Sequence, residues 1–227
     1  TTDDLLKTYK DGSASEPEKR QLENMLFQYG RYLTIASSRE DSQLPSNLQG
    51  VWNSLTNPPW SSDYHMNVNL QMNYWPTYST NLSECALPLI DYVDSLREPG
   101  RVTAKVYAGV ESKDGEANGF MAHTQNTPFG WTCPGWAFSW GWSPAAVPWI
   151  LQNCWEYYEF TGDTEFMEEN IYPMLKEEAT FYNQILTEDK DGKLVSSPSY
   201  SPEHGPYTAG NTYAVSYTHL TLPTIRL

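Results

Sequence analysis

The chain has 227 residues, 28 acidic against 14 basic side chains and a formal net charge of −14, and it is rich in tryptophan (9) and tyrosine (16). That charge disfavours nucleic acid and anionic membranes, which select basic patches, and no apolar run approaches the ~18 residues of a membrane span. The four histidines and three cysteines show no metal-ligand or disulfide spacing, so we expect a neutral ligand, no metal and no cofactor.

The first predicted element is a helix with readable ends. Ser15-Glu16-Pro17-Glu18 has the form of a capping box with proline in the first turn. Apolar side chains then recur at helical spacing until near Ser38: Leu22, Met25, Leu26, Tyr29, Leu33 and Ala36. Residues 1–15 are assigned to an N-terminal connector.

Long irregular segments alternate with the helices that follow. Residues 39–66 and 109–143 are rich in aromatic side chains, glycine and proline, and loops of this length are usually functional when ordered. Helices are predicted over about 70–79, 84–96 and 101–108, and Ser143-Pro144 predicts another, with serine as its cap. A helical pair over about 164–170 and 172–187 and a short strand over 193–196 complete the order.

This order predicts an all-α fold. No strand–helix alternation appears, which argues against a Rossmann fold or a TIM barrel. A toroid of paired inner and outer helices fits, with the long aromatic-rich loops building a site at one end. At ~11–12 residues per helix plus connections, the chain supplies about half of the dozen helices that such a ring needs.

The last residues differ in character from the rest. From about Val215 the chain lacks both helical spacing and acidic side chains. The pattern resembles a sequencing adapter translated in frame, and such scars carry no fold information. We therefore expect residues 214–227 to be a non-native tail and residues 16–213 to be the partial catalytic domain.

The most informative residues are Asn67 and Asn69. Two amides two residues apart share one face if the backbone is extended, and each offers both a donor and an acceptor. Such a pair can orient a water molecule or a carboxylate. The structural alternative is that they satisfy backbone groups at a helix start, where asparagine is a favoured cap.

Glu203 is the candidate acid. Most lone glutamates are solvated surface charges, but this one lies in a segment stiffened by Pro198, Pro202 and Pro206. A rigid loop that presents one carboxyl is what a positioned general acid needs, and burial beside proline and aromatic side chains would raise its pKa toward the working pH.

Aromatic and imidazole side chains near these groups are the predicted sugar contacts. In each case the alternative is an ordinary core or loop residue. Asp63 is interpreted as a loop residue that accepts hydrogen bonds from nearby backbone N–H groups, rather than as a second catalytic carboxylate. The predicted substrate-binding residues are Tyr64, His65, Trp75, His123, Trp136 and His204.

Three sequence blocks resemble glycoside hydrolase family 95. They begin at Leu44-Pro-Ser-Asn-Leu-Gln-Gly-Val-Trp, at Asn57-Pro-Pro-Trp and at Ser197-Pro-Ser. The second block runs on through Asp63-Tyr-His-x-Asn67-x-Asn69 to Pro76 and is long enough to be highly specific. The family consists chiefly of α-L-fucosidases that act on α-1,2-linked fucose.

The resemblance implies an (α/α)6 catalytic barrel, flanked by β-domains in the full enzyme, and an inverting mechanism. Glu203 would protonate the leaving glycosidic oxygen, and Asn67 and Asn69 would orient the attacking water together with an aspartate base. His65 matches a position where histidine accompanies fucose. The implied partner is a fucosylated oligosaccharide or glycan.

The family carries its aspartate base in a later motif, Gln-Ile-Asp-Gly-Asn-Phe-Gly, which these 227 residues lack. We therefore expect the chain to be a fragment of an α-L-fucosidase, about the first half of the toroid, and inactive alone. Two other functions stay open: an α-L-galactosidase of the same family, and a carbohydrate-binding toroid without catalysis.

Overall fold

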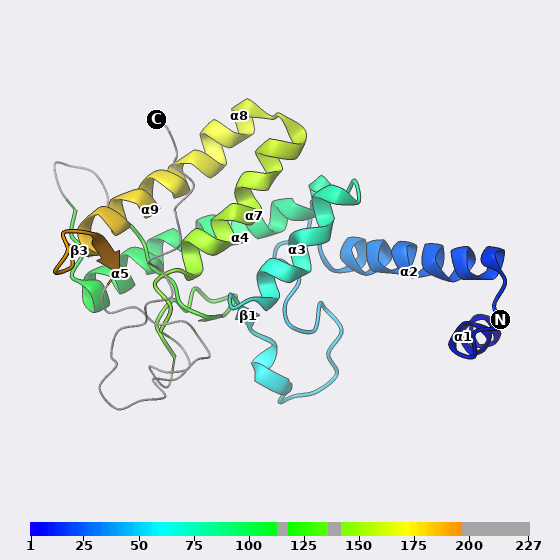
Figure 1. Cartoon of the computed structure of the whole chain (residues 1–227). Helices are drawn as coiled ribbons and strands as arrows, with labels where there is room; N and C mark the ends of the chain where they lie inside the picture. The colour runs from blue at the N-terminus through cyan, green and yellow to red at the C-terminus, as the bar shows by residue number, and fades with distance from the viewer. Residues whose placement is uncertain (113–117, 136–141, 197–227) are drawn as a thin grey trace.

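The computed structural model describes residues 1–112, 118–135 and 142–196, and these residues are mostly helical, as the sequence predicts (Figure 1). Glu203, His204, Trp136 and the predicted tail over residues 214–227 lie outside the described ranges. Closure of the helices into a toroid, and the placement of the aromatic loops around it, stay predictions. None of the helices within the described ranges is both long and apolar enough to cross a membrane.

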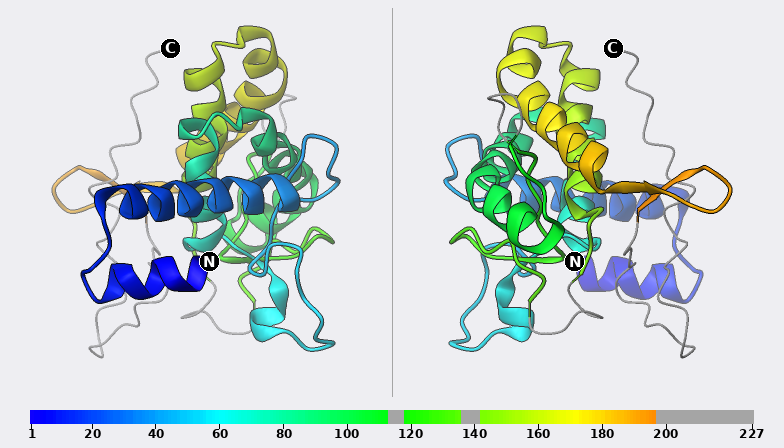
Figure 2. Two further views of the ribbon diagram at one scale, coloured as in Figure 1. Left: turned by 90° about the vertical axis from the view of Figure 1, so that its right-hand side faces the viewer. Right: turned by 90° about the vertical axis from the view of Figure 1, so that its left-hand side faces the viewer.

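Two helices form an arm at the N-terminus. Helix α1 spans Thr2–Lys10, inside the predicted connector, and α2 spans Glu16–Ser37. The predicted capping box of α2 is confirmed, because the Ser15 backbone N–H and hydroxyl both donate to the Glu18 carboxylate, at 2.8 and 2.7 Å. Figure 1 shows this arm reaching away from the other helices, and in the left view of Figure 2 it lies in front of them, nearest the viewer.

The body consists of helices and short helical turns that follow the predicted order. The 3₁₀ turn η1 (Pro59–Ser62) precedes α3 (Asn69–Ser79). Next come the turn η2 (Ser83–Ala86), α4 (Leu87–Ser95) and α5 (Arg97–Ala108). The last group is α7 (Ala146–Thr161), α8 (Thr164–Phe166), the π-helical turn η3 (Met167–Ile171) and α9 (Tyr172–Ile185).

Two helix starts differ from the prediction. Helix α5 begins at Arg97 rather than Arg101, because Pro99 lies in its first turn, where a missing N–H costs nothing. Helix α7 begins at Ala146, so Ser143 is not its cap. The backbone around Ser143 is used elsewhere: its N–H donates to the His123 ring, and the Pro144 carbonyl accepts the Tyr182 hydroxyl.

The strands are short and lie in two antiparallel pairs. β1 (Tyr64–His65) pairs with β2 (Gln125–Asn126), so that Tyr64 faces Asn126 and His65 faces Gln125. β3 (Leu186–Glu188) pairs with β4 (Leu194–Ser196), which confirms the predicted strand there. The first pair matters for function, because it joins the two segments that the sequence treats as separate long loops.

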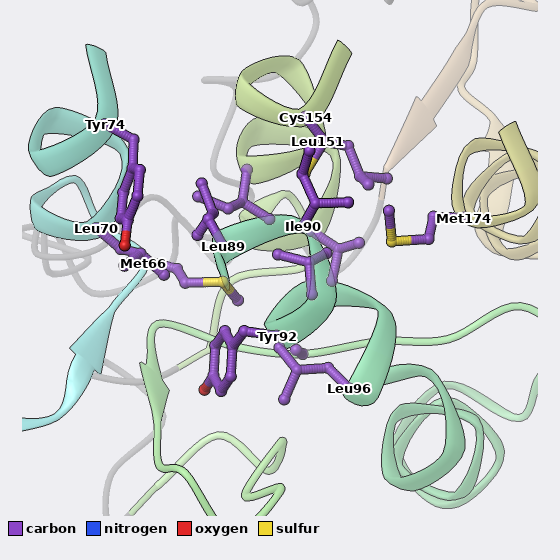
Figure 3. Packing of buried hydrophobic residues seen from close by; sticks show 14 of the residues in the cluster. Met66, Leu70, Tyr74, Leu89, Ile90, Tyr92, Leu96, Leu151, Cys154 and Met174 are labelled. Atoms are coloured by element: carbon purple, nitrogen blue, oxygen red, sulfur yellow. The ribbon is translucent and has the colours of Figure 1, made fainter. Parts of the chain in front are cut away.

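The main core lies between α3, α4, α7 and η3 (Figure 3). Leu89, Ile90 and Ile150 are fully buried there, and removing any of these side chains would cost about 2–5 kcal/mol. The Tyr78 hydroxyl crosses this core and donates to the Asn153 carbonyl at 2.6 Å. The core therefore holds α3, whose first turn carries Asn69, rigidly against α7.

Candidate active site

The segment before α3 is anchored on both sides. Tyr64 packs against Tyr92 with ring centroids 4.5 Å apart, and its hydroxyl donates to the Pro45 carbonyl at 3.3 Å. The Met66 N–H donates to the Thr124 carbonyl at 2.7 Å and continues the ladder between β1 and β2. Tyr64 is 3 % exposed, so it supports the segment from inside, and its sugar contact stays a prediction.

Asn67 and Asn69 lie on a turn and at the start of a helix, so the condition of an extended backbone, under which the two amides would share one face, is not met. Asn67 belongs to the turn that leads into α3, and Asn69 is the first residue of that helix. The Gln71 amide donates to the Met66 carbonyl at 2.9 Å and closes this turn from within. Helical geometry begins here because the buried side chains of Leu70 and Tyr74 are one turn apart and face the core.

The two amides are available for a ligand. The N-cap of α3 is Val68, so the alternative that these asparagines cap the helix is wrong. Asn67 is partly buried and Asn69 is exposed. Within the described residues neither side chain makes a hydrogen bond to the protein, so the donors and acceptors of both amides remain unused at the surface.

His65 is held by Asp63. The His65 Nδ1 atom lies 3.1 and 3.3 Å from the two carboxylate oxygens of Asp63, and both residues are buried. A carboxylate only accepts hydrogen bonds, so Nδ1 carries the proton in this pair. Within the described residues no backbone N–H donates to the Asp63 carboxylate, so that expectation is wrong; the carboxylate fixes the orientation of the His65 ring.

The sequence missed this pairing, although it carries a signal for it. Asp63 and His65 are two residues apart, the spacing that places side chains on one face of an extended segment. The backbone just before Asp63 is unusual: Trp60, Ser61 and Ser62 have φ values of 47°, 56° and 49°, in the left-handed region that ordinary residues avoid. Such strain is concentrated at functional sites.

His123 lies in the interior, behind the predicted site. It has no exposed surface, its Nδ1 accepts the Ser143 N–H at 2.9 Å, and its ring lies 4.8 Å from that of Trp142. Burial lowers its pKa to about 3. His123 is therefore neutral with its proton on Nε2, and its predicted role as a sugar contact stays a prediction.

The remaining predicted contacts are distributed as follows. Trp75 lies on α3 and is 49 % exposed. Asn73, one turn beyond Asn69, donates to the Asn47 carbonyl at 3.2 Å and holds the preceding loop against α3. How Glu203, His204 and Trp136 are arranged around these residues stays a prediction.

Among the described residues, no group of three His, Cys, Asp or Glu side chains is placed to hold a metal ion.

The comparisons with known proteins agree with one another. The family model described as "Glycosyl hydrolase family 95 catalytic domain" matches residues 1–223, a range that includes part of the predicted tail. The chain is 38 % identical over 220 residues to "Probable alpha-fucosidase A" of Aspergillus niger, covering 95 % of this chain and 26 % of that protein. It is 42 % identical over 200 residues to "Alpha-L-fucosidase 2" of Arabidopsis thaliana, covering 87 % of this chain and 23 % of that protein.

A further relative, "Probable alpha-fucosidase A" of Aspergillus oryzae, is 43 % identical over 112 residues, covering 49 % of this chain and 14 % of that protein. The chain spans about a quarter of the length of the first two relatives. The family model matches nearly every residue of the chain, including the whole segment that carries Asp63, His65, Asn67 and Asn69. The chain therefore belongs to the glycosyl hydrolase family 95 catalytic-domain family.

Proposed function

We propose that this chain carries part of the active site of an inverting glycosidase that removes terminal α-L-fucosyl residues, most of all α-1,2-linked ones, from oligosaccharides. One observation supports this most strongly: within the described residues the Asn67 and Asn69 amides make no hydrogen bond to the protein, and two residues before Asn67 a buried carboxylate holds the His65 imidazole in place. The relatives' names, which specify fucosidases, support the substrate.

The proposed chemistry divides between three groups. Asn67 and Asn69 orient the attacking water with their amide oxygens and N–H groups, which suit a neutral molecule that both donates and accepts. Glu203 donates its proton to the leaving glycosidic oxygen. An aspartate from the later family motif, absent from these 227 residues, removes the proton from the water. An inverting pair stands roughly 6.5–9.5 Å apart, which leaves room for that water.

His65 is proposed to contact the sugar. Its ring cannot rotate freely, because Asp63 holds Nδ1 and the strand pairing with Gln125 fixes the backbone. A ring that is already positioned loses little conformational entropy when the sugar binds. Its hydrogen bonds therefore distinguish one sugar from another better than those of a mobile ring. Comparing hydrolysis of α-L-fucosides with α-L-galactosides, which add one hydroxyl at C6, tests this contact.

The chain alone is proposed to bind fucosides without hydrolysing them, because its sequence lacks the base motif. Release of fucose from 2′-fucosyllactose by the purified chain would refute that part of the proposal.

The catalytic roles are tested in a polypeptide that includes the complete catalytic domain. Glu203→Gln should lower kcat roughly 10²–10⁴-fold while substrate binding persists, because only proton donation is lost. A protein that only binds carbohydrate would hydrolyse no substrate, with or without this substitution. The first-formed fucose should be the β-anomer by proton NMR, and an α-anomer would exclude inversion.

A further inference from the structure

A hollow of about 270 Å³ lies next to the proposed fucose site, and no part of the mechanism uses it. It opens between the C-terminal end of α2, the loop that follows and α3. Its walls include Ser46, Asn47, Gln49, Trp52, Asn73 and Tyr74, and none of the described residues that line it is charged. A neutral wall of hydroxyls, amides and one indole suits a ligand that is itself neutral and rich in hydroxyl groups.

The shape of this hollow is fixed by hydrogen bonds. The Tyr74 hydroxyl accepts the Ser46 N–H at 2.8 Å and lies 2.7 Å from the Ser38 hydroxyl. The Gln49 N–H donates to the Asn47 side chain at 2.8 Å, and the Asn73 amide donates to the Asn47 carbonyl at 3.2 Å. The hollow is therefore built before any ligand arrives, which lowers the entropy cost of binding.

Several polar groups of the wall remain unused. Within the described residues, the Ser46 hydroxyl, the Asn47 and Gln49 amide N–H₂ groups and the Asn73 amide oxygen have no hydrogen-bond partner, and none of them is sealed off from the surface. Donors and acceptors are both represented, as the hydroxyl groups of a sugar require.

Trp52 supplies an aromatic wall. Its indole is 49 % exposed, and its six-membered ring lies over Gly50, where an added Cβ would come within 2.6 Å of it. Gly50 also has φ +65°, a conformation that favours glycine. The loop thus needs glycine at position 50 both to turn and to admit the indole. A half-exposed ring held in this way is suited to stacking against the apolar face of a pyranose.

Helix α3 and the loop before it connect the hollow to the proposed site. Asn73 is four residues after Asn69 on the same face of α3, about 6 Å further along the helix axis. The loop that lines the hollow is also joined to the segment before His65, since the Leu48 N–H donates to the Asp63 carbonyl at 3.2 Å and Ser62 donates to the Gln49 side chain.

We propose that this hollow is a second saccharide subsite, which holds a sugar unit next to the fucosyl residue of the same oligosaccharide and stacks it on Trp52. The proposal rests on the proposed function for its assignment to the glycan chain. That the hollow takes a neutral sugar rests on its own residues alone.

The test is a titration of the isotope-labelled chain with 2′-fucosyllactose and, separately, with methyl α-L-fucoside, followed by NMR. The trisaccharide should shift both the Trp52 indole N–H signal, assigned by its loss in Trp52→Phe, and the side-chain amide signals of Asn67 and Asn69. The monosaccharide should shift only the two amides. Trp52→Ala should weaken trisaccharide binding about tenfold and leave the fucoside affinity unchanged.

Trp131→Ala is the matched control, because Trp131 is also 49 % exposed and does not line the hollow; both affinities should be retained. If the trisaccharide shifts Asn67 and Asn69 but not Trp52, the subsite is refuted and the proposed function stands. If it shifts Trp52 alone, the sugar-binding hollow stands and the proposed function fails. If it shifts neither, both are refuted.

Discussion

Glu177 and Glu178 are neighbours on α9, and their surroundings shift the pKa values of their carboxyl groups in opposite directions. Burial would raise the pKa of Glu177, but Arg101 and Arg97 each donate to it from 3.0 Å and lower its pKa overall. Glu178 is buried and has no hydrogen-bond partner among the described residues, and its burial, together with the charge of Glu177, raises its pKa well above the usual value. Glu178 therefore stays protonated in the folded chain over a wide pH range.

This difference predicts how stability depends on pH. Below pH 4.5 Glu178 is protonated in both the folded and the unfolded chain, so it imposes no charge cost. Above 4.5 the unfolded chain releases the proton and the folded chain keeps it, so the free energy of unfolding falls by up to about 1.4 kcal/mol per pH unit. Glu178→Gln should therefore become more stable relative to the original chain as pH rises from 4 to 7, measured by urea unfolding.

Glu169→Gln is the matched control, because it replaces a glutamate by glutamine at an exposed position of η3. Comparing each variant with the original chain at the same pH cancels the contribution of His123, which is present in both. The lowered pKa of His123 would otherwise make the free energy of unfolding rise with pH below 6.5, opposite to the effect of Glu178. A Glu178→Gln difference that is the same at pH 4 and pH 7 would contradict the assignment.

The Asp63–His65 pair makes a second prediction at this scale. In the original chain the ¹⁵N shifts of His65 should show the proton on Nδ1, because the carboxylate accepts it. Asp63→Ala should move the ring toward the Nε2–H form, whereas Asp191→Ala, on an exposed turn, should not. A His65 ring that is unprotonated at Nδ1 before mutation would refute the positioning role of Asp63.

At the level of helices and strands, local signals predict most of the fold. The Ser15–Glu18 box and the apolar spacing after it define α2, and apolar spacing alone places α3 and α9. Contacts with distant parts of the chain cannot be read from a local pattern. Ser143 and Pro144 look like a helix start, but the Ser143 N–H donates to His123 and the Pro144 carbonyl accepts from Tyr182. The contact of β1 with β2 joins residues about 60 apart, which no local pattern encodes.

Close packing of one element on another gives a prediction with a matched control. A Cβ at Gly119 would lie 2.4 Å from the backbone of α9 at Glu177 and Phe181, so Gly119→Ala should cost about 3 kcal/mol of unfolding free energy. Gly30→Ala, in an open part of α2, should instead raise local helix stability by about 0.5–1 kcal/mol. Urea unfolding measures the first change and amide exchange within α2 the second. Equal stability of the Gly119→Ala variant and the original chain would contradict the packing.

At the level of the whole molecule, the arm formed by α1 and α2 is the most exposed feature (Figure 2). Apolar side chains recur along α2 at helical spacing and form a stripe, yet Leu26 is 73 % and Tyr29 58 % exposed, and Ser37 is the one buried residue of this helix. An exposed apolar stripe of this kind favours association. The sequence identifies the stripe correctly because spacing is local, and it cannot place the surface that would cover it.

We expect the purified chain to self-associate through this stripe. Its average mass by sedimentation equilibrium should rise with concentration, and Leu26→Lys should lower that rise. Leu194→Lys replaces a leucine of similar exposure on β4 and should leave the rise unchanged. A chain that stays monomeric at every concentration would show that α2 needs no partner.

The sequence proposes residue types for the candidate site but cannot supply their geometry. The spacing of Asn67 and Asn69 can be read in the chain, while the turn that carries Asn67 and the Asp63–His65 contact depend on a strand partner and a core that lie far away in the chain. Among the residues that the structure describes, both amides nevertheless lie without protein partners, as a ligand-binding role requires.

The most direct test of the account is the affinity of this chain for methyl α-L-fucoside, measured by NMR titration. Asn67→Ala and Asn69→Ala should each weaken binding about tenfold, since each removes hydrogen bonds to the ligand. Asn24→Ala, at an exposed position of α2, should leave the affinity unchanged. Unchanged affinity in both site variants, or no binding by the original chain, would contradict the central claim that these two amides form part of a fucose site.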